Sequence, residues 1–270
     1  METKNFTKEK DRAIAAALEA GAIIRSIYHT NYTVDYKGND SPVTRADREA
    51  NHKIHSILQG AFPNDGWLSE ETVDSPARLS RRRVWVVDPM DGTKEFIQKI
   101  PEFAVSIALV EDGVPVVGVA YNPVGKLYWA VRGQGAWCEE RRLQVSSLAR
   151  LQEATILSSR SETKRGEWDA FKGTFRTRPT GSIAYKLAVI AAGEADASFT
   201  LVPKNEWDIC AGVLLVEEAG GHVSNLDGTT VVFNQAKTLL PGLIASNAVL
   251  YDPIMQLISR HKRFGPSIRQ

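Results

Sequence analysis

Residues 85–93 read WVVDPMDGT, an apolar strand that ends in two aspartates, Asp88 and Asp91. Two carboxylates three positions apart repel each other unless a cation lies between them. Hard divalent cations such as Mg²⁺ take oxygen ligands, and Pro89 fixes a corner that turns the carbonyl of Met90 toward the same point. The segment therefore predicts a metal site at the end of a buried strand. An ordinary strand ending in an Asp-Gly turn is the alternative.

The two residues that follow Asp91 suit an anion and a water molecule. Gly92 allows the backbone to approach an anion closely, and Thr93 offers a hydroxyl that can orient a water. If a helix begins at Gly92, its first N–H groups face the same point and would suit a phosphate.

The bulk properties are those of a globular enzyme. A chain of 270 residues can bury a large core, and its 43% hydrophobic and 24% charged residues are ordinary values. The formal net charge of +1 gives no reason to expect a nucleic acid polymer or an anionic membrane as a partner. Residues 1–12 are polar and charged, unlike a signal peptide, and the apolar run 13–28 is interrupted by Glu19 and Arg25. We therefore expect a cytoplasmic protein.

Hydrophobic periodicity divides the chain into two parts. The first part is predicted to contain helices at 13–28 and 44–58, followed by a region rich in strands from 83 to 145, with strands at 103–110, 114–121, 126–131 and 136–145. The second alternates strands at 154–158, 175–178, 197–201 and 243–246 with helices at 162–172, 182–192, 208–219 and 248–260. This change predicts an α+β subdomain over 1–148 and an α/β subdomain over 149–270, meeting at the metal site.

Four further acidic residues draw attention. Glu70 and Glu71 precede the strand that carries Asp88, Asp208 follows Trp207 at the start of a predicted helix, and Asp47 lies in the first turn of another. Each has a structural alternative, because paired glutamates often form an exposed turn and Asp commonly caps a helix.

Taken in order, Ser69-Glu70-Glu71, the Asp-Pro-x-Asp-Gly-Thr motif at 88–93 and Trp207-Asp208 resemble the inositol monophosphatase superfamily. The continuation Lys94-Glu95-Phe96-Ile97 is most similar to the 3'(2'),5'-bisphosphate nucleotidase branch. The resemblance covers nearly the whole chain. It includes Lys37 before Ser41-Pro42-Val43-Thr44, Gly181-Ser182 and residues 217–221. It implies a layered αβαβα sandwich of the inositol monophosphatase and fructose-bisphosphatase type.

The resemblance also implies a magnesium-dependent phosphatase that binds two or three Mg²⁺ ions. Its implied metal ligands are Glu70, Asp88, Asp91, Asp208 and the carbonyl of Met90. Glu70 and Thr93, the latter supported by Asp47, would orient the attacking water, and the amides of Gly92 and Thr93 would hold the phosphate. Relatives of this kind are often inhibited by lithium and often form homodimers, and we expect the former here.

The substrate is less strongly indicated. The resemblance favours 3'-phosphoadenosine 5'-phosphate, with Ser159, Arg160, Ser182 and Lys186 as candidate contacts. Glu162 replaces the histidine of the branch's Ser-Arg-Ser-His, and Tyr185 stands where the branch has a lysine. Inositol 1-phosphate or another sugar phosphate is the alternative. It is disfavoured because Leu201 occupies the position of a ring-binding glutamate. A non-catalytic protein that binds a metal or a nucleotide is a more distant alternative.

Overall fold

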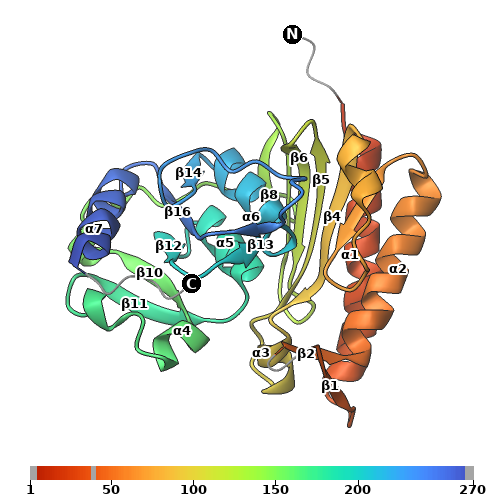
Figure 1. Cartoon of the computed structure of the whole chain (residues 1–270), viewed down its shortest axis with the longest axis horizontal. Coiled ribbons are helices and arrows are strands. Elements are labelled where there is room, and N and C mark those ends of the chain that lie inside the picture. Colours follow the sequence, from red (N-terminus) through yellow and green to blue (C-terminus); the bar gives the residue numbers. More distant parts are fainter. Residues whose placement is uncertain (1–4, 38–40, 265–270) are drawn as a thin grey trace.

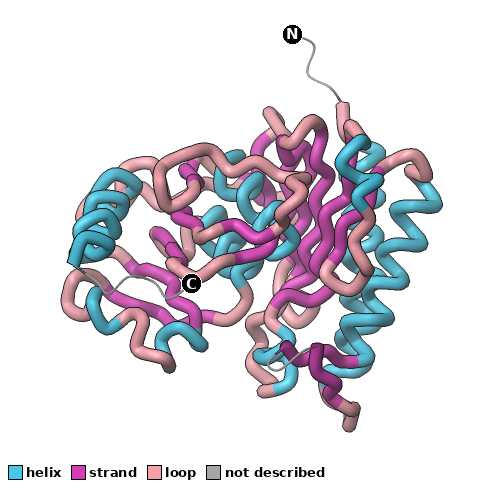
Figure 2. Tube along the Cα trace, in the orientation of Figure 1, coloured by secondary structure: helices cyan, strands magenta, loops and turns pink. Residues whose placement is uncertain are grey.

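The computed structural model describes residues 5–37 and 41–264, and it has five layers (Figure 1, Figure 2). Two helices, α1 (Thr7–Tyr28) and α2 (Arg45–Ala61), cover the outer face of a seven-stranded sheet. Two more, α5 (Ile183–Ala191) and α6 (Glu206–Glu218), lie between this sheet and a five-stranded one, which α7 (Tyr251–Phe264) covers on its far side. The predicted αβαβα sandwich is confirmed.

The seven-stranded sheet positions the two aspartates of the first motif. Its order is β3-β4-β5-β6-β7-β8-β9, with β3 and β4 parallel and the remaining pairs antiparallel. The bounds are β3 (Gly66–Ser69), β4 (Arg83–Asp91), β5 (Ala104–Glu111), β6 (Val114–Tyr121), β7 (Leu127–Val131), β8 (Gly135–Cys138) and β9 (Arg141–Arg142).

Strand β4 is apolar from Val84 to Val87 because both of its faces are buried there. Trp85 and Val87 pack with α1 and α2, whereas Val84 and Val86 pack with α5 and α6. Side chains alternate along a strand, so Asp88 continues the face of Val84 and Val86 toward α6. The pairing of β4 with β5 becomes irregular between Asp88 and Asp91, at the corner that the sequence predicts.

The five-stranded sheet has the order β11-β10-β12-β16-β14. Its strands are β10 (Thr155–Ser159), β11 (Arg176–Thr180), β12 (Ala197–Thr200), β14 (Gly221–Ser224) and β16 (Leu243–Asn247). The pairs β10–β11 and β10–β12 are parallel, and β16 runs antiparallel to both of its neighbours. Helix α6 is apolar on all sides because it lies between the two sheets, and Cys210 is fully buried on it.

Several short elements complete the fold. They are the hairpin β1 (Val34–Lys37) and β2 (Ser41–Thr44), the pair β13 (Lys204–Asn205) and β15 (Leu239–Leu240), the helices α3 (Thr93–Ile97) and α4 (Arg160–Lys164), and 3₁₀ turns at Pro76–Ser80, Leu151–Glu153 and Asp169–Phe171. The sequence analysis missed the β1–β2 hairpin and the strand β3. Four-residue strands are too short for a clear alternating pattern.

Two predicted elements are wrong in extent. The helix expected at 162–172 is the short α4, then turns and a 3₁₀ turn, because Gly166 adopts φ 79° and redirects the chain. Trp168 and Phe171 then enter the core beneath the sheet. The strand expected at 136–145 is divided into β8 and β9 by a turn in which Glu139 has φ 54°.

Three further observations concern membrane-spanning helices, the cysteines and the division into subdomains. No helix in the described ranges combines the length and the apolar character needed to cross a bilayer. Cys138 and Cys210 are both buried free thiols. The division into subdomains at 148/149 stays a prediction, and the ends of both, residues 1–4 and 265–270, lie outside the described residues.

Candidate metal and substrate site

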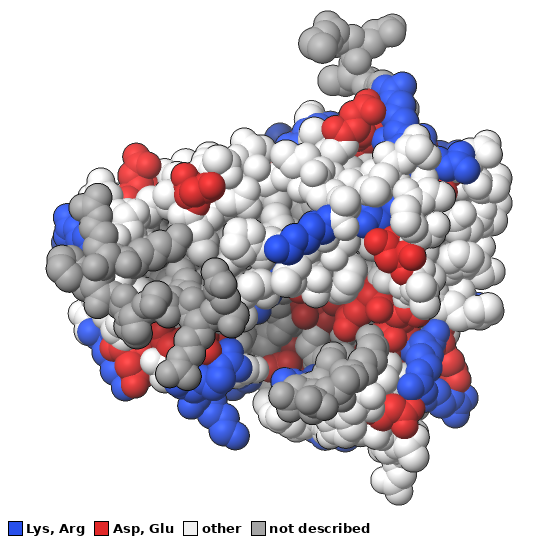
Figure 3. All heavy atoms as spheres, in the orientation of Figure 1, with Lys and Arg blue, Asp and Glu red and all other residues white. Residues whose placement is uncertain are grey.

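A cavity of about 660 Å³ opens where the ends of β3 and β4 meet the beginnings of α5 and α6. Acidic side chains gather around the hollow between the two sheet-containing parts in the space-filling view (Figure 3). Most of the predicted site residues line this cavity: Glu70, Asp88, Met90, Asp91, Gly92, Thr93, Ser159, Ser182, Lys186 and Asp208. Asp47 and Arg160 do not line it.

Each of the three aspartates is held through one carboxylate oxygen. Asp88 Oδ1 accepts a hydrogen bond from the Met90 amide at 2.9 Å, and Asp208 Oδ2 accepts one from the Asn205 amide, also at 2.9 Å. Asp91 Oδ2 accepts two, from the Ser182 hydroxyl at 2.6 Å and the Ala184 amide at 2.7 Å. In the described part of the chain, no hydrogen bond reaches the second oxygen of these three carboxylates.

Burial raises the pKa of three of these carboxyl groups, and neighbouring negative charges raise the pKa of Asp88 and Asp208 further. Burial raises the pKa of Asp88 well above its usual value, and the charges of Glu70, Asp91 and Asp208 raise it further. The pKa of Asp208 is also well above its usual value, through burial and then the charge of Asp91. Burial likewise raises the pKa of Asp91, although the hydrogen bonds from Ser182 and Ala184 oppose this shift. Such a group of carboxylates gains free energy from any cation that enters.

The carboxylates share the cavity without forming a compact ligand set. Among residues 5–37 and 41–264, no three His, Cys, Asp or Glu side chains are already close enough together to enclose an ion. The donor set fits hard divalent cations because it consists of carboxylate oxygens and the Met90 carbonyl, with no thiol or imidazole in the lining of the cavity.

Thr93 and Asp47 form a hydrogen-bonded pair beside the carboxylates. The hydroxyl of Thr93 lies 2.9 Å from Asp47 Oδ1 and 3.2 Å from the Met90 carbonyl oxygen. Asp47 Oδ2 accepts from the amide and the hydroxyl of Thr44, at 2.6 and 2.7 Å, so the predicted capping interaction of α2 is present. Asp47 therefore caps α2 and fixes the Thr93 hydroxyl at the same time, and burial raises its pKa.

Gly92 is required by its backbone conformation and by its neighbours. Its φ of 97° is left-handed, and a Cβ there would lie 2.9 Å from the Glu102 carbonyl oxygen. Helix α3 begins directly after it, so the first-turn amides have no acceptor within the helix. Gly92 is thus the N-cap of α3, which meets the condition under which the sequence suits a phosphate here.

The four candidate substrate contacts have different surroundings. Ser159 lines the cavity, and Ser182 does too, but the Ser182 hydroxyl donates to Asp91. Arg160 is turned away and forms a bidentate ion pair with Glu102, at 2.8 and 2.9 Å. Lys186 lines the cavity although it is only 3% exposed.

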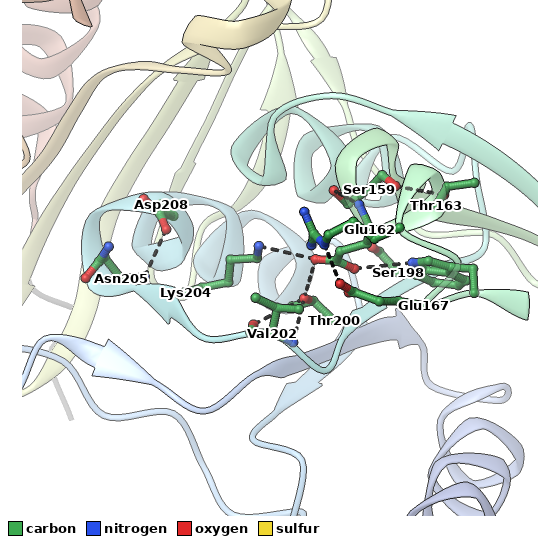
Figure 4. A network of polar contacts seen from close by, with 12 residues as sticks. Ser159, Glu162, Thr163, Glu167, Ser198, Thr200, Val202, Lys204, Asn205 and Asp208 are labelled. Carbon is green, nitrogen blue, oxygen red and sulfur yellow. Dashed lines mark hydrogen bonds and ion pairs between the residues drawn. The ribbon is translucent and has the colours of Figure 1, made fainter. Parts of the chain in front are cut away.

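Residues that the sequence analysis did not place in the site include Glu102 and Glu162. Glu102 also accepts from the Gly181 amide at 2.7 Å, which ties the loop before α5 to the first half of the chain. Glu162 is 2% exposed and lies 3.3 Å from the ammonium group of Lys204, which lines the cavity (Figure 4). The sequence shows that glutamate replaces histidine at position 162. It does not show that this glutamate pairs with a lysine 42 positions later.

Comparisons with known proteins agree with this geometry. The model of the inositol monophosphatase family matches residues 7–263. An inositol-1-monophosphatase from Mesorhizobium japonicum is 36% identical over 92% of this chain and 94% of its own length. The 3'(2'),5'-bisphosphate nucleotidase CysQ from Salmonella typhimurium is 38% identical over 84% of this chain and 94% of its own. The crystal structure of the extragenic suppressor protein suhB from Bartonella henselae superposes with a TM-score of 0.83 at 32% identity, covering 94% of this chain and 99% of that one.

Fold and site together are those of a metal-dependent phosphatase. The chain belongs to the inositol monophosphatase family, as its sequence motifs predict. Its relatives in that family bear names for different activities, so membership leaves the substrate to be proposed from the cavity itself.

Proposed function

We propose that this protein is a Mg²⁺-dependent phosphomonoesterase that hydrolyses a small phosphorylated metabolite, with 3'-phosphoadenosine 5'-phosphate as the favoured substrate. The observation that carries the proposal is the convergence of Glu70, Asp88, Asp91 and Asp208 on one cavity that also contains the hydroxyl of Thr93. These residues come from three separate segments of the chain and meet at one cavity, which is typical of a catalytic site.

The four carboxylates and the Met90 carbonyl would hold two or three Mg²⁺ ions. Bound there, Mg²⁺ would polarise the phosphate and make an attacking water more acidic. Sensitivity to lithium is part of the same proposal, because a monovalent cation could compete for oxygen ligands. The homodimer and the cytoplasmic location stay predictions.

The protein's own groups orient the water and the phosphate. Because the Thr93 hydroxyl donates to Asp47 at 2.9 Å, its oxygen lone pairs are available to accept a hydrogen bond from the water and so orient it. Asp47 is 2% exposed and anchored by Thr44, so the direction of that hydroxyl is fixed before substrate arrives. Glu70, which also lines the cavity, would accept the water's other hydrogen bond and so orient it with Thr93. The amides of Gly92 and Thr93 would hold the phosphate oxygens.

Two features favour the nucleotide over inositol phosphate. Leu201 contributes to a separate small cavity beside Trp168 and Phe199 and does not line the main one. Lys186 and Lys204 do line the main cavity, and they are suited to anions rather than to the hydroxyls of an uncharged ring. Inositol 1-phosphate or another sugar phosphate remains the second candidate because the relative from Mesorhizobium japonicum carries that activity in its name.

The substrate proposal predicts a clear preference in a side-by-side assay. Phosphate release with Mg²⁺ should be at least about tenfold more efficient, by kcat/KM, for 3'-phosphoadenosine 5'-phosphate than for inositol 1-phosphate, since one well-made charged hydrogen bond is worth that much. The reverse preference would assign the chain to the sugar-phosphate candidate. No release from either ester, in a folded protein that binds Mg²⁺, would instead support a binding protein.

Metal binding should also change stability in a pH-dependent way. The raised pKa values of Asp88, Asp91 and Asp208 mean that the metal-free folded state holds protons that the unfolded chain has lost. Its stability therefore falls as the pH rises above the usual carboxyl range, whereas Mg²⁺ binds the deprotonated groups. At 100 times its Kd, Mg²⁺ should raise the Tm by roughly 5–10 °C at pH 8 and by clearly less at pH 5.5. An equal rise at both pH values, measured against a sample with EDTA, would contradict the proposed ligand set.

A further inference from the structure

A turn over residues 69–72 carries Glu70 to the cavity at the end of β3. The Glu70 amide continues the pairing of β3 with β4 by donating to the Val87 carbonyl oxygen at 3.2 Å. The Thr72 amide closes the turn by donating to the Ser69 carbonyl oxygen at 3.3 Å. Both distances are long for backbone hydrogen bonds, and contacts made by side chains therefore matter for the geometry of this turn.

Asn51, on α2, bridges the two ends of the turn through its side-chain amide. Its Oδ1 accepts from the Ser69 hydroxyl at 2.7 Å, and its Nδ2 donates to the hydroxyl oxygen of Thr72 at 3.1 Å. Ser69 is only 3% exposed, and its hydroxyl oxygen also accepts from the Glu71 amide at 3.4 Å. One side chain of α2 therefore holds the residues on both sides of the paired glutamates.

The same face of α2 holds the other residue that is proposed to orient the water. Asp47, one turn before Asn51, accepts from the Thr93 hydroxyl at 2.9 Å. Residues four positions apart in a helix are neighbours on one face, and they lie about 6 Å apart along its axis. The helix therefore sets the separation between the Thr93 hydroxyl and the turn that carries Glu70.

Trp67 joins the same turn to α2 a second time. Its indole nitrogen donates to the hydroxyl oxygen of Thr72 at 3.2 Å, and its ring lies edge-on to that of His55 with the ring centres 4.8 Å apart. Asp47, Asn51 and His55 follow one another at intervals of four positions, so one face of α2 makes all of these contacts. The position of the turn relative to the helix is thereby well defined.

We propose that Asn51 is a positioning residue: it fixes the turn that carries Glu70, so that Glu70 and Thr93 present their oxygens to the same attacking water. This inference rests on the proposed function, because it assumes the water-orienting roles of those two residues. Asn51 does not line the cavity and acts through the turn. Its side chain can hold both ends of the turn because it carries an acceptor and a donor on one carbon.

The first test is Asn51→Leu, which nearly keeps the size of the side chain and removes both hydrogen bonds. With the preferred phosphate ester at saturating Mg²⁺, kcat should fall roughly 10- to 100-fold and KM should stay within about threefold, since a displaced water-orienting group slows the chemical step more than it weakens substrate binding. His52→Gln is the matched control, because it changes the next, exposed residue of α2 and should alter neither value. Asn51→Asp should recover most of the activity, because a carboxylate can accept from the hydroxyls of both Ser69 and Thr72.

A measurement without metal or substrate tests the contact itself. In metal-free Asn51→Leu, the amides of Glu71 and Thr72 should exchange with deuterium at least about tenfold faster than in wild type, because both donate to Ser69, whose hydroxyl has lost its partner. Amides in the middle of β4 should exchange at the wild-type rate. If Asn51→Leu does not fold, Ser69→Ala removes the same 2.7 Å hydrogen bond from the other side and should give the same results for kcat and for the Thr72 amide.

A double-mutant cycle separates positioning from a general loss of structure. In a Glu70→Gln background, the group that Asn51 positions is already altered, so adding Asn51→Leu should lower the residual kcat less than about threefold. Equal factors in both backgrounds, or unchanged exchange of the Thr72 amide in metal-free Asn51→Leu, would overturn the proposal. If wild type hydrolyses no phosphate ester, the proposed function fails, whereas the exchange measurement still decides whether Asn51 fixes the turn.

Discussion

Asp91→Asn is expected to lower the Mg²⁺-dependent phosphatase activity by about three orders of magnitude, because a metal ligand contributes several kcal/mol to the stability of the transition state. The fold should survive. An Asn oxygen can still accept from Ser182 and Ala184, which hold Asp91 Oδ2 at the start of α5. The Tm of the metal-free variant should be unchanged or higher, because one of the mutually repelling carboxylates becomes neutral.

The measurements are phosphate release across a Mg²⁺ titration and calorimetric Mg²⁺ binding. Asp169→Asn serves as the matched control, since that aspartate pairs with Lys172 outside the cavity and should have no effect. Retention of more than about a tenth of the activity in Asp91→Asn at saturating Mg²⁺ would show that the proposed ligand set is wrong.

Thr93→Val should lower kcat by roughly 10²- to 10⁴-fold while leaving the calorimetric Kd for Mg²⁺ within about threefold. Valine matches threonine in shape but cannot accept a hydrogen bond from a water, nor donate one to Asp47 as the Thr93 hydroxyl does at 2.9 Å. None of the proposed metal ligands is substituted in this variant. This split between kcat and metal affinity distinguishes a water-orienting role from a metal-binding one.

Thr93→Ser is the matched control, because it restores the hydroxyl on the same backbone and should recover most of the activity. Asp47→Asn should resemble Thr93→Val in kcat, since Asp47 fixes the direction of the hydroxyl. If Thr93→Val lowers Mg²⁺ affinity as strongly as it lowers kcat, then the hydroxyl would belong to the metal site, and the proposed division of roles would fail.

Much of the fold follows from local patterns in the sequence. The continuous apolar run of β4 reflects a strand buried on both faces, and the capping residues Thr44 and Asp47 mark the start of α2. The family motifs are local as well, which is why family and layer order could be predicted together. The prediction of a helix at 162–172 is wrong. A polar stretch with one glycine and two aromatic residues does not reveal whether those aromatic residues continue a helix or enter a core.

The candidate substrate residues show where sequence reasoning ends. Tyr185 stands where the nucleotide branch has a lysine, and the next residue, Lys186, has a side chain that lines the cavity because of how α5 packs. Arg160, equally plausible from its motif, pairs with Glu102, which lies 58 positions earlier in the chain. A motif specifies which residue types are present, whereas long-range packing decides which of them face the cavity.

The sequence by itself determined the family, the layered fold and the acidic residues that belong to the motifs, because strand alternation, helix caps and short motifs depend on neighbours within a few positions. Only the tertiary structure decided that Asp91 is held by Ser182 and Ala184, that Glu162 positions Lys204, and that Lys186 is buried without a partner. These relations join segments 42 to 93 positions apart or depend on the packing around a single ammonium group. The burial and the charged partners of these side chains depend on contacts that form only when the two sheets and the helices between them pack together.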